Sequence, residues 1–307
     1  MELIRFEIGK DYNIGQIAIA LGEFDGLHVA HQVLIKKAVN YAKDNNIKSA
    51  VFSFDPHPDF VLKKRTNHGY ITPMTEKMDR LEKLGVDYFV VLPFTLEFSR
   101  LDPIEFINDY LNSFAIRKIV VGFDYRFGFK GKGNTDLLKE HFNVEVVEKI
   151  ELDNLKIGSN EIREFLMKGD LDTVKSMLGR YYNITGNVIT GNKVGRTFGI
   201  RTANIQIEEH YQTIRKGVYA VFVNFNGDRY FGVCNIGNNP TINYVKIPRL
   251  EVHILDFNKE IYEKEISVDF VKFLRDEFKF DTVEEMVVQI NKDIENAKEI
   301  LEKELWE

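Results

Sequence analysis

Two histidines, His28 and His31, lie three residues apart directly after a short turn that contains two glycines. The apolar run before the turn (17–21) predicts a strand, and the amphipathic stretch after it (27–44) predicts a helix. The first turn of a helix presents unpaired N–H groups and a partial positive charge, which favour phosphate. Two imidazoles on one helix face could therefore hydrogen-bond neighbouring phosphate oxygens and stabilise charge on a leaving pyrophosphate.

Other interpretations of this histidine pair remain open. The two side chains could be surface histidines of an amphipathic helix, half of a zinc site, or capping groups of the helix. A zinc site needs further ligands, and the sequence contains neither a cysteine pair nor an HExxH segment. A short motif of this kind often arises by chance, but its position directly after a buried-looking strand favours nucleotide binding.

The elements that would position the histidines form an alternating pattern in the first half of the chain. Near-continuous apolar strands alternate with helices, which predicts a parallel sheet covered on both faces. Ligands bind beyond the carboxyl ends of such strands, where the turn after residue 21, the prolines after Phe54 and the loop after Val121 are expected. The predicted strands are 17–21, 49–54, 88–92 and 118–122, and the predicted helices are 27–44, 75–84 and 103–111.

The pattern changes near residue 183, where β-branched and aromatic runs follow one another without intervening helices. This predicts an antiparallel sheet or small barrel, with a tight hairpin at Asn226-Gly227. A closing helix with an apolar stripe from Val283 to Leu305 is expected to pack on its own domain, although a coiled coil has the same pattern. The predicted strands are 182–190, 217–225, 230–235, 250–255 and 265–270, and a short helix is expected at 160–168.

Composition limits the classes of protein. A chain of 307 residues, 44% hydrophobic and 29% charged, can form two globular domains. The net charge of -6 argues against a general binder of nucleic acid or anionic membranes. The single Cys234 suits a reducing cytoplasm, and the chain has neither a signal-peptide core nor the ~20 consecutive apolar residues of a membrane span. We therefore expect a soluble, cytoplasmic protein.

The segment GEFDGLHVAH resembles the G-x-F-D-G-x-H-x-G-H signature of the bacterial bifunctional riboflavin kinase/FMN adenylyltransferases. Further blocks similar to this family follow in its order across nearly the whole chain. They are SFDPHP, VGFDYRFGFKGKGN, LGRYYNITGNVITGNKVGRTFGIRTAN, GVYAVFV, GVCNIGNNPT and LEVHILDF. The resemblance implies an α/β fold. A Rossmann-like nucleotidylyltransferase domain (1–180) would precede a small antiparallel β-barrel riboflavin kinase domain with a C-terminal helix (181–307).

The N-terminal reaction of this family transfers AMP from ATP to FMN, which gives FAD and pyrophosphate. The resemblance implies that the catalytic His28 and His31 hold ATP phosphates while the protein positions and neutralises the reactants. Positive charge in the loop after Val121 also comes from Lys130 and Lys132, for which a solvated basic loop is the alternative. The residues that the resemblance assigns to binding ATP or the flavin are Gly22, Phe24, Asp25, Gly26, Phe54, His57, Asp124, Arg126, Ser159 and Arg163.

The C-terminal reaction of the family phosphorylates riboflavin. Thr202 and Asn204 resemble its T-A-N motif, which contacts the nucleotide phosphates and Mg²⁺, and their oxygens are hard donors of the kind Mg²⁺ prefers. Glu251 matches the general base that would take the proton from the riboflavin primary alcohol, whereas an exposed strand carboxylate is the structural alternative. The resemblance also assigns binding roles to Gly195, Arg196, Asn235 and Arg275. Phe270 and Phe273 are expected near the flavin or in the core.

Three positions depart from the family pattern. Ala30 replaces the glycine of H-x-G-H, and Arg201 replaces a proline that presets the backbone before Thr202. The family's S-S-T-R-I-R is here GSNEIR, so that Glu161 supplies a carboxylate where the family has a guanidinium. If Glu161 faces the triphosphate, like-charge repulsion would weaken ATP binding; if it faces solvent, nothing follows.

The leading hypothesis is a bifunctional enzyme that uses Mg·ATP to convert riboflavin to FMN and FMN to FAD. Its partners would be riboflavin, FMN and ATP, with no nucleic acid, no membrane and no obligate protein partner. A riboflavin kinase with an impaired adenylyltransferase domain is the main alternative, and a non-catalytic flavin or nucleotide sensor is another. A tRNA synthetase-like enzyme would share the histidine turn, but the acidic balance and the lack of a KMSKS-like segment disfavour it.

Overall fold

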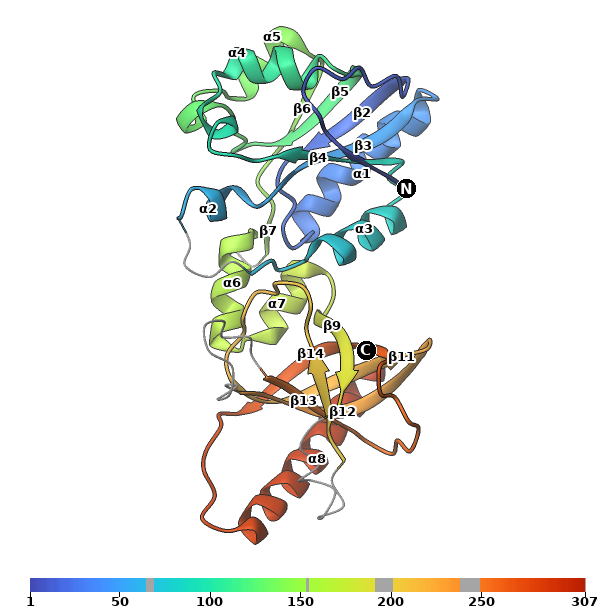
Figure 1. Ribbon diagram of the computed structural model, residues 1–307, viewed down its shortest axis with the longest axis vertical. Helices are drawn as coiled ribbons and strands as arrows, with labels where there is room; N and C mark the ends of the chain where they lie inside the picture. Colours follow the sequence, from blue (N-terminus) through green and yellow to red (C-terminus); the bar gives the residue numbers. More distant parts are fainter. Residues whose placement is uncertain (65–68, 153–154, 191–200, 238–248, 307) are drawn as a thin grey trace. The chain divides into compact units, whose positions relative to one another are not determined.

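The computed structural model describes residues 1–64, 69–152, 155–190, 201–237 and 249–306. It divides into two compact units, Met1–Ser159 and Asn160–Glu307 (Figure 1). Two helices between residues 159 and 178 lie mainly in the second unit. The sequence predicts the boundary between the two functional domains after residue 180, and this boundary stays a prediction.

The first unit contains a six-stranded sheet in which every neighbouring pair is parallel. The predicted parallel sheet is confirmed, and each predicted apolar run lies within one of its strands. The outer strands β1 and β6 are additional, because four residues each are too few to form a recognisable apolar run. In sheet order the strands are β1 (Glu2–Arg5), β4 (Tyr88–Pro93), β3 (Lys48–Asp55), β2 (Gln16–Leu21), β5 (Ala115–Gly122) and β6 (Val144–Val147).

The strand order creates a switch point beside β2. The chain runs from β2 through β3 and β4 toward one edge, and β5 then returns to the other side of β2. In open α/β sheets, ligands bind outside the carboxyl ends of the strands at such a point. The three loops predicted at this edge follow β2, β3 and β5, which are neighbours in the sheet.

Helices cover both faces of this sheet, as predicted (Figure 1). On one face, Ile35 and Leu81 pack with Val51 and Phe89, whereas alternate strand residues on the other face pack around Phe106. The predicted helix over 103–111 is a short α-helix followed by a π-helical turn. The helices are α1 (Val29–Asp44), α2 (Pro58–Val61), α3 (Met74–Lys83), α4 (Pro103–Phe106), the turn η2 (Ile107–Leu111) and α5 (Thr135–His141). The remaining short elements are η1 (Phe98–Arg100), η3 (Phe129–Gly131), β7 (Glu151–Leu152) and β8 (Leu155–Lys156).

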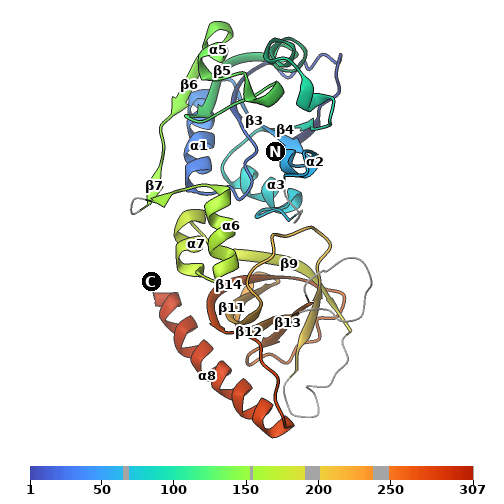
Figure 2. The same cartoon turned by 90° about the vertical axis from the view of Figure 1, so that its left-hand side faces the viewer.

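The second unit is a closed antiparallel barrel, as the sequence predicts (Figure 2). Asn226 and Gly227 both have positive φ angles, 51° and 85°, which two-residue hairpin turns of this kind require. Strand β10 is additional to the predicted strands, because it is short and lies within the polar T-A-N segment. In barrel order the strands are β10 (Ala203–Gln206), β13 (Arg249–Ile254), β12 (Asp228–Gly237), β11 (Gly217–Phe225), β14 (Glu265–Arg275) and β9 (Tyr182–Ile189).

Three helices accompany the barrel: α6 (Ser159–Lys168), α7 (Leu171–Leu178) and α8 (Val283–Trp306). The closing helix α8 packs on its own barrel, as predicted, because Ala297 and Leu301 are buried against Val218, Phe222 and Val233. Helix α7 follows α6 after a break at Gly169, whose φ is positive, and the sequence pattern does not distinguish it. None of the helices in the described residues has the length and apolar character to cross a membrane.

Candidate active sites

His28 is the N-cap of helix α1, which begins at the next residue, Val29. The backbone N–H of His31 donates to Nδ1 of His28 at 3.3 Å, and His28 has non-helical backbone angles. The two rings stack with 3.5 Å between their centroids, and His28 is only 4% exposed. Capping, one of the alternatives in the sequence, is thus one role of His28. The pair nevertheless forms a compact unit at the helix N-terminus.

His31 provides the polar group that the protein leaves available. Its Nδ1 is buried and has no hydrogen-bond partner among the described residues. Burial lowers the pKa of His31 well below 6.5, and the neighbouring His28 and Lys77 lower this pKa further. His31 is therefore neutral at pH 7. A buried nitrogen without a partner is a natural contact point for a ligand.

The turn before α1 has an unusual backbone. Phe24 and Leu27 have positive φ angles of 53° and 42°, which residues with a side chain rarely adopt. Gly26 also has a positive φ, 89°, and a Cβ built on it would lie 3.4 Å from Ile71. Phe24 is 1% exposed and its ring meets His31 edge-on at 5.2 Å, so its described contacts are core contacts. Such a turn needs strong anchors.

Asp25 is one of these anchors. Its side chain is 1% exposed, and Oδ1 accepts the backbone N–H groups of Ile71 at 2.9 Å and Thr72 at 3.2 Å. Its carbonyl accepts a hydrogen bond from Ser159 Oγ at 2.7 Å. The described bonds of Asp25 and Ser159 thus shape the turn. Their predicted contacts with ATP stay predictions.

His57, at the end of β3, joins this turn through a residue that the sequence reasoning missed. Nδ1 of His57 accepts the N–H of Asp59 at 3.1 Å, which leaves Nε2 as the ring nitrogen that can donate. That Nε2 lies 2.9 Å from the carboxylate of Glu23. His57 is 3% exposed, whereas the Glu23 side chain is 42% exposed. His57 and Glu23 are therefore within ion-pair distance, although Nε2 makes no hydrogen bond among the described residues, and the family signature leaves the position of Glu23 unspecified.

A tyrosine completes the polar network at the end of β3. The hydroxyl of Tyr70 accepts the N–H of His57 at 3.0 Å and donates to Asp55 Oδ1 at 3.3 Å. Burial and the nearby Asp55 raise the pKa of Tyr70 to about 12, so the hydroxyl keeps its proton at neutral pH. The network fixes the segment that follows the predicted Phe54, whose ring contacts those of Phe94 and Phe98.

The loop after β5 brings charge to the same sheet edge. Asp124 is exposed and pairs with Lys156 at 3.2 Å. The hydroxyl of Tyr125 is buried without a hydrogen-bond partner among the described residues, and burial and Glu23 raise its pKa. Arg126 is exposed. The ammonium groups of Lys130 and Lys132 lie 5.3 and 5.8 Å from the ring of Phe129, so both the binding and the solvated-loop interpretations of these lysines remain.

Arg163 and Glu161 lie on α6, in the second unit. Nε of Arg163 donates to Oε1 of Gln212 at 3.1 Å, a bond within that unit. Glu161 is half-buried in the first turn of the helix. Whether its carboxylate faces the triphosphate stays a prediction.

The barrel register brings together three of the predicted residues of the kinase reaction. Glu251 on β13 pairs directly with Asn204 on β10 and with Asn235 on β12. Directly paired residues project from the same face of a sheet, so these three side chains are neighbours. Nδ2 of Asn235 donates to Glu277 at 3.1 Å, while its Oδ1 is buried without a hydrogen-bond partner in the described part of the chain. Thr202 lies exposed just before β10.

The side chains of Asn204 and of the nearby Thr202 fit a magnesium ion that arrives with a nucleotide. The amide oxygen of Asn204 and the hydroxyl of Thr202 are hard ligands, and Mg²⁺ typically takes only one or two protein ligands beside substrate phosphates. No group of three His, Cys, Asp or Glu side chains that could hold a metal occurs among the described residues. Thr202 and Asn204 stay the predicted ligands.

Two other predicted flavin contacts are engaged in the fold. Arg275 bonds the carboxylate of Asp293 at 3.0 and 2.7 Å and lies over the ring of Phe278. Phe270 is 1% exposed and packs against the rings of Tyr182 and Tyr219. Their roles toward the flavin stay predictions. The predicted Gly195 and Arg196 lie outside the described residues.

Comparisons with known proteins identify two families along the chain. The model of the FAD synthetase family matches residues 10–161, and that of the riboflavin kinase family matches residues 178–301. A bifunctional riboflavin kinase/FMN adenylyltransferase of Listeria monocytogenes is 41% identical over 285 residues, 91% of each chain. Its counterpart from Bacillus subtilis is 38% identical over 287 residues, 91% of this chain and 90% of the relative. The chain belongs to this family.

The family membership confirms the predicted pairing of an adenylyltransferase domain with a riboflavin kinase domain. The fold comparison covers both: a crystal structure from Streptococcus pneumoniae, described as a macrolide-efflux protein, matches with a TM-score of 0.89 and 30% identity. The match covers 97% of this chain and 99% of the other. The α/β fold with its C-terminal barrel is thereby confirmed as well.

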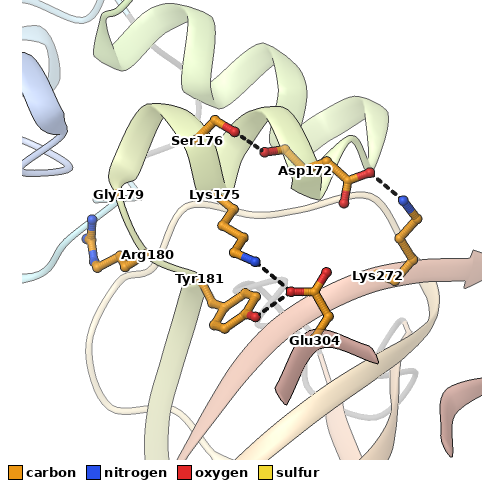
Figure 3. Close-up of a pocket in the computed structure, with 8 residues that line it drawn as sticks. All are labelled: Asp172, Lys175, Ser176, Gly179, Arg180, Tyr181, Lys272 and Glu304. Atoms are coloured by element: carbon orange, nitrogen blue, oxygen red, sulfur yellow. Dashed lines mark hydrogen bonds and ion pairs between the residues drawn. The ribbon is translucent and has the colours of Figure 1, made fainter. Parts of the chain in front are cut away.

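The second unit also carries a polar pocket of about 740 Å³, and its lining residues do not include Glu251, Asn204 or Asn235 (Figure 3). Lys175 and Tyr181 both donate to the carboxylate of Glu304, and Lys272 pairs with Asp172. The bond of Lys175 joins α7 to the end of α8, and the pair of Lys272 and Asp172 joins β14 to α7. The bond of Tyr181 joins the residue before β9 to α8. The sequence reasoning did not identify this pocket. Its lining residues are Asp172, Lys175, Ser176, Gly179, Arg180, Tyr181, Lys272 and Glu304.

Proposed function

We propose that this chain phosphorylates riboflavin to FMN in the barrel and adenylylates FMN to FAD in the parallel-sheet domain, with ATP as the donor in both steps. The observation that carries the proposal is the row of Asn204, Glu251 and Asn235, which places the predicted base beside the predicted metal ligand. The His28–His31 pair lies in the other unit. The two reactions would therefore have separate sets of residues.

Adenylyl transfer asks the protein mainly to position charged groups. The phosphate of FMN is already ionised at neutral pH, so it can attack the α-phosphorus of ATP without a general base. Pyrophosphate then leaves with additional negative charge. The N-terminus of α1 and the neutral His31 supply hydrogen bonds at the place where we expect this charge to develop.

Riboflavin phosphorylation differs because the attacking group is a neutral alcohol. Its proton must be taken up as the oxygen attacks the γ-phosphorus, and the Glu251 carboxylate, which lies beside Asn204 in the barrel register, would be the acceptor. Asn204 and Thr202 would hold Mg²⁺, which neutralises charge on the transferred phosphoryl group when bound. Asn235, with its available Oδ1, would orient the flavin or the nucleotide.

The proposal includes Mg²⁺ as the cofactor of both steps and a cytoplasmic location, which the buried free thiol of Cys234 supports. It requires riboflavin, FMN and ATP, and no nucleic acid, membrane or obligate protein partner.

A time course tests the proposal directly. Purified protein is incubated with riboflavin and Mg·ATP, and the flavins are separated chromatographically. We expect FMN to appear first and FAD to follow. If FMN accumulates and no FAD forms, even when FMN itself is the starting substrate, the protein is a kinase with an inactive adenylyltransferase domain. Bound riboflavin without any product would identify a sensor.

A further inference from the structure

Lys77, on α3, is a buried lysine at the adenylyltransferase site that no part of the proposed function uses. Its side chain is only 3% exposed, whereas lysines are almost never fully buried without a partner. Nζ donates to the backbone carbonyl of Glu23 at 3.2 Å. Burial lowers the pKa of Lys77, and the carboxylates of Asp25, Glu23 and Asp55 oppose this shift. Three acids at or just beyond the ends of β2 and β3 thus offset part of the cost of burying the Lys77 ammonium.

The carbonyl that Lys77 contacts belongs to the strained turn. Glu23 directly precedes Phe24, whose φ is 53°, and the same carbonyl accepts a hydrogen bond from Ser53 Oγ at 2.7 Å. Two donors from two different elements, α3 and β3, therefore hold one oxygen of the turn. A carbonyl has two lone pairs, so both can bind at once and fix the direction of the peptide.

The ammonium of Lys77 also acts on the histidine pair. The groups that face His31 are His28 on its own helix, the ring of Phe24 from the turn and Lys77 from α3. Both His28 and Lys77 disfavour protonation of His31. Removal of the ammonium would therefore favour a protonated His31.

We propose that Lys77 is a positioning residue for adenylyl transfer, acting through its bond to the Glu23 carbonyl and through its charge beside His31. This inference rests on the proposed function, because it assigns a role within the same site. Lys77 holds the turn that approaches ATP. It also keeps His31 neutral, so that one ring nitrogen can donate a hydrogen bond and the other can accept one.

The test compares Lys77→Met, Lys77→Arg and the matched control Lys83→Met, which removes an exposed lysine from the same helix. FAD formation from FMN is measured against pH, and riboflavin phosphorylation in the same preparation serves as the internal reference. A thermal melt checks folding. Methionine matches the stem of lysine in length and leaves no buried polar atom.

We expect Lys77→Met to lower kcat for FAD formation about tenfold to hundredfold, the range for loss of a charged hydrogen bond. Riboflavin phosphorylation should remain unchanged. The acid limb of the FAD profile should move to higher pH, because His31 becomes easier to protonate. Lys77→Arg should restore part of the rate and most of the profile, and Lys83→Met should match the wild type.

Two results would overturn the inference: wild-type kcat and profile in Lys77→Met, or a loss of rate with an unmoved acid limb and no rescue by arginine. A wild-type chain that makes no FAD would instead refute the proposed function. In that case an NMR titration of the His31 imidazole decides on Lys77. Its midpoint should rise in Lys77→Met, and an unchanged midpoint would overturn the inference.

Discussion

The pair of Arg275 and Asp293 offers a quantitative test of whether a predicted flavin residue serves the fold instead. The Asp293 carboxylate accepts two bonds from Arg275 Nε at 3.0 Å and one from Nη2 at 2.7 Å. Gln289 adds a fourth bond at 2.9 Å. The side chains of Asp293 and Arg275 are 6% and 19% exposed, so this ion pair between β14 and α8 is largely removed from water.

The substitution Asp293→Asn keeps the shape of the side chain and removes its charge. Breaking a fully buried pair typically costs about 3–5 kcal/mol, and the exposed edge of Arg275 reduces our expectation to about 2–3 kcal/mol. For a unit of this size, such a loss lowers Tm by roughly 4–12 °C. The matched control is Asp256→Asn, which removes an exposed partner of Lys298, also on α8, at 3.5 Å. We expect about 0–1 kcal/mol there.

Urea titrations followed by circular dichroism and by residual riboflavin phosphorylation measure the effect. Both probes should show a lower midpoint for Asp293→Asn, with the KM for riboflavin unchanged in native conditions. If Asp293→Asn is as stable as Asp256→Asn but has a raised KM for riboflavin, the reasoning is wrong and Arg275 serves the flavin.

Three further predictions concern the two sites. Because the pKa of His31 is lowered in the folded state, the unfolded chain binds more protons there, and the first unit should lose stability as pH falls below 6.5; thermal melts from pH 7.5 to 5.5 check this. If Glu161 faces the triphosphate, Glu161→Arg should lower the KM for ATP in FAD formation, and an unchanged KM would place the carboxylate in solvent. A Cβ at Gly186 would lie 2.4 Å from the Gln206 carbonyl, so Gly186→Ala should destabilise the barrel by about 1–3 kcal/mol, and an unchanged Tm would contradict this packing.

The sequence allowed prediction of elements with long apolar runs, such as β2, β11 and the stripe of α8. It did not predict β1, β6 or β10, because four residues carry too little pattern. In the candidate sites, His28 and His31 are only three residues apart in the sequence, so the pair was identified directly. The helical start at Val29 was not, because capping depends on the backbone angles of His28.

The residues that were missed act across distant segments. Lys77 meets the turn 54 positions earlier in the chain, and Glu23 meets His57 from another strand end. Nothing in the local pattern around Lys77 separates it from Lys83, the exposed lysine of the same helix. The adjacency of Asn204, Glu251 and Asn235 likewise depends on strand register, which only the closed barrel defines.

The central claim is that two separate sites perform the two reactions. The most direct measurement gives riboflavin or FMN separately, with Mg·ATP, to wild type, Glu251→Gln and His28→Asn, in which asparagine can still cap α1. We predict that Glu251→Gln loses FMN formation by about a hundredfold or more while FAD formation from FMN persists, and that His28→Asn shows the reverse. Equal loss of both reactions in either variant would contradict the account.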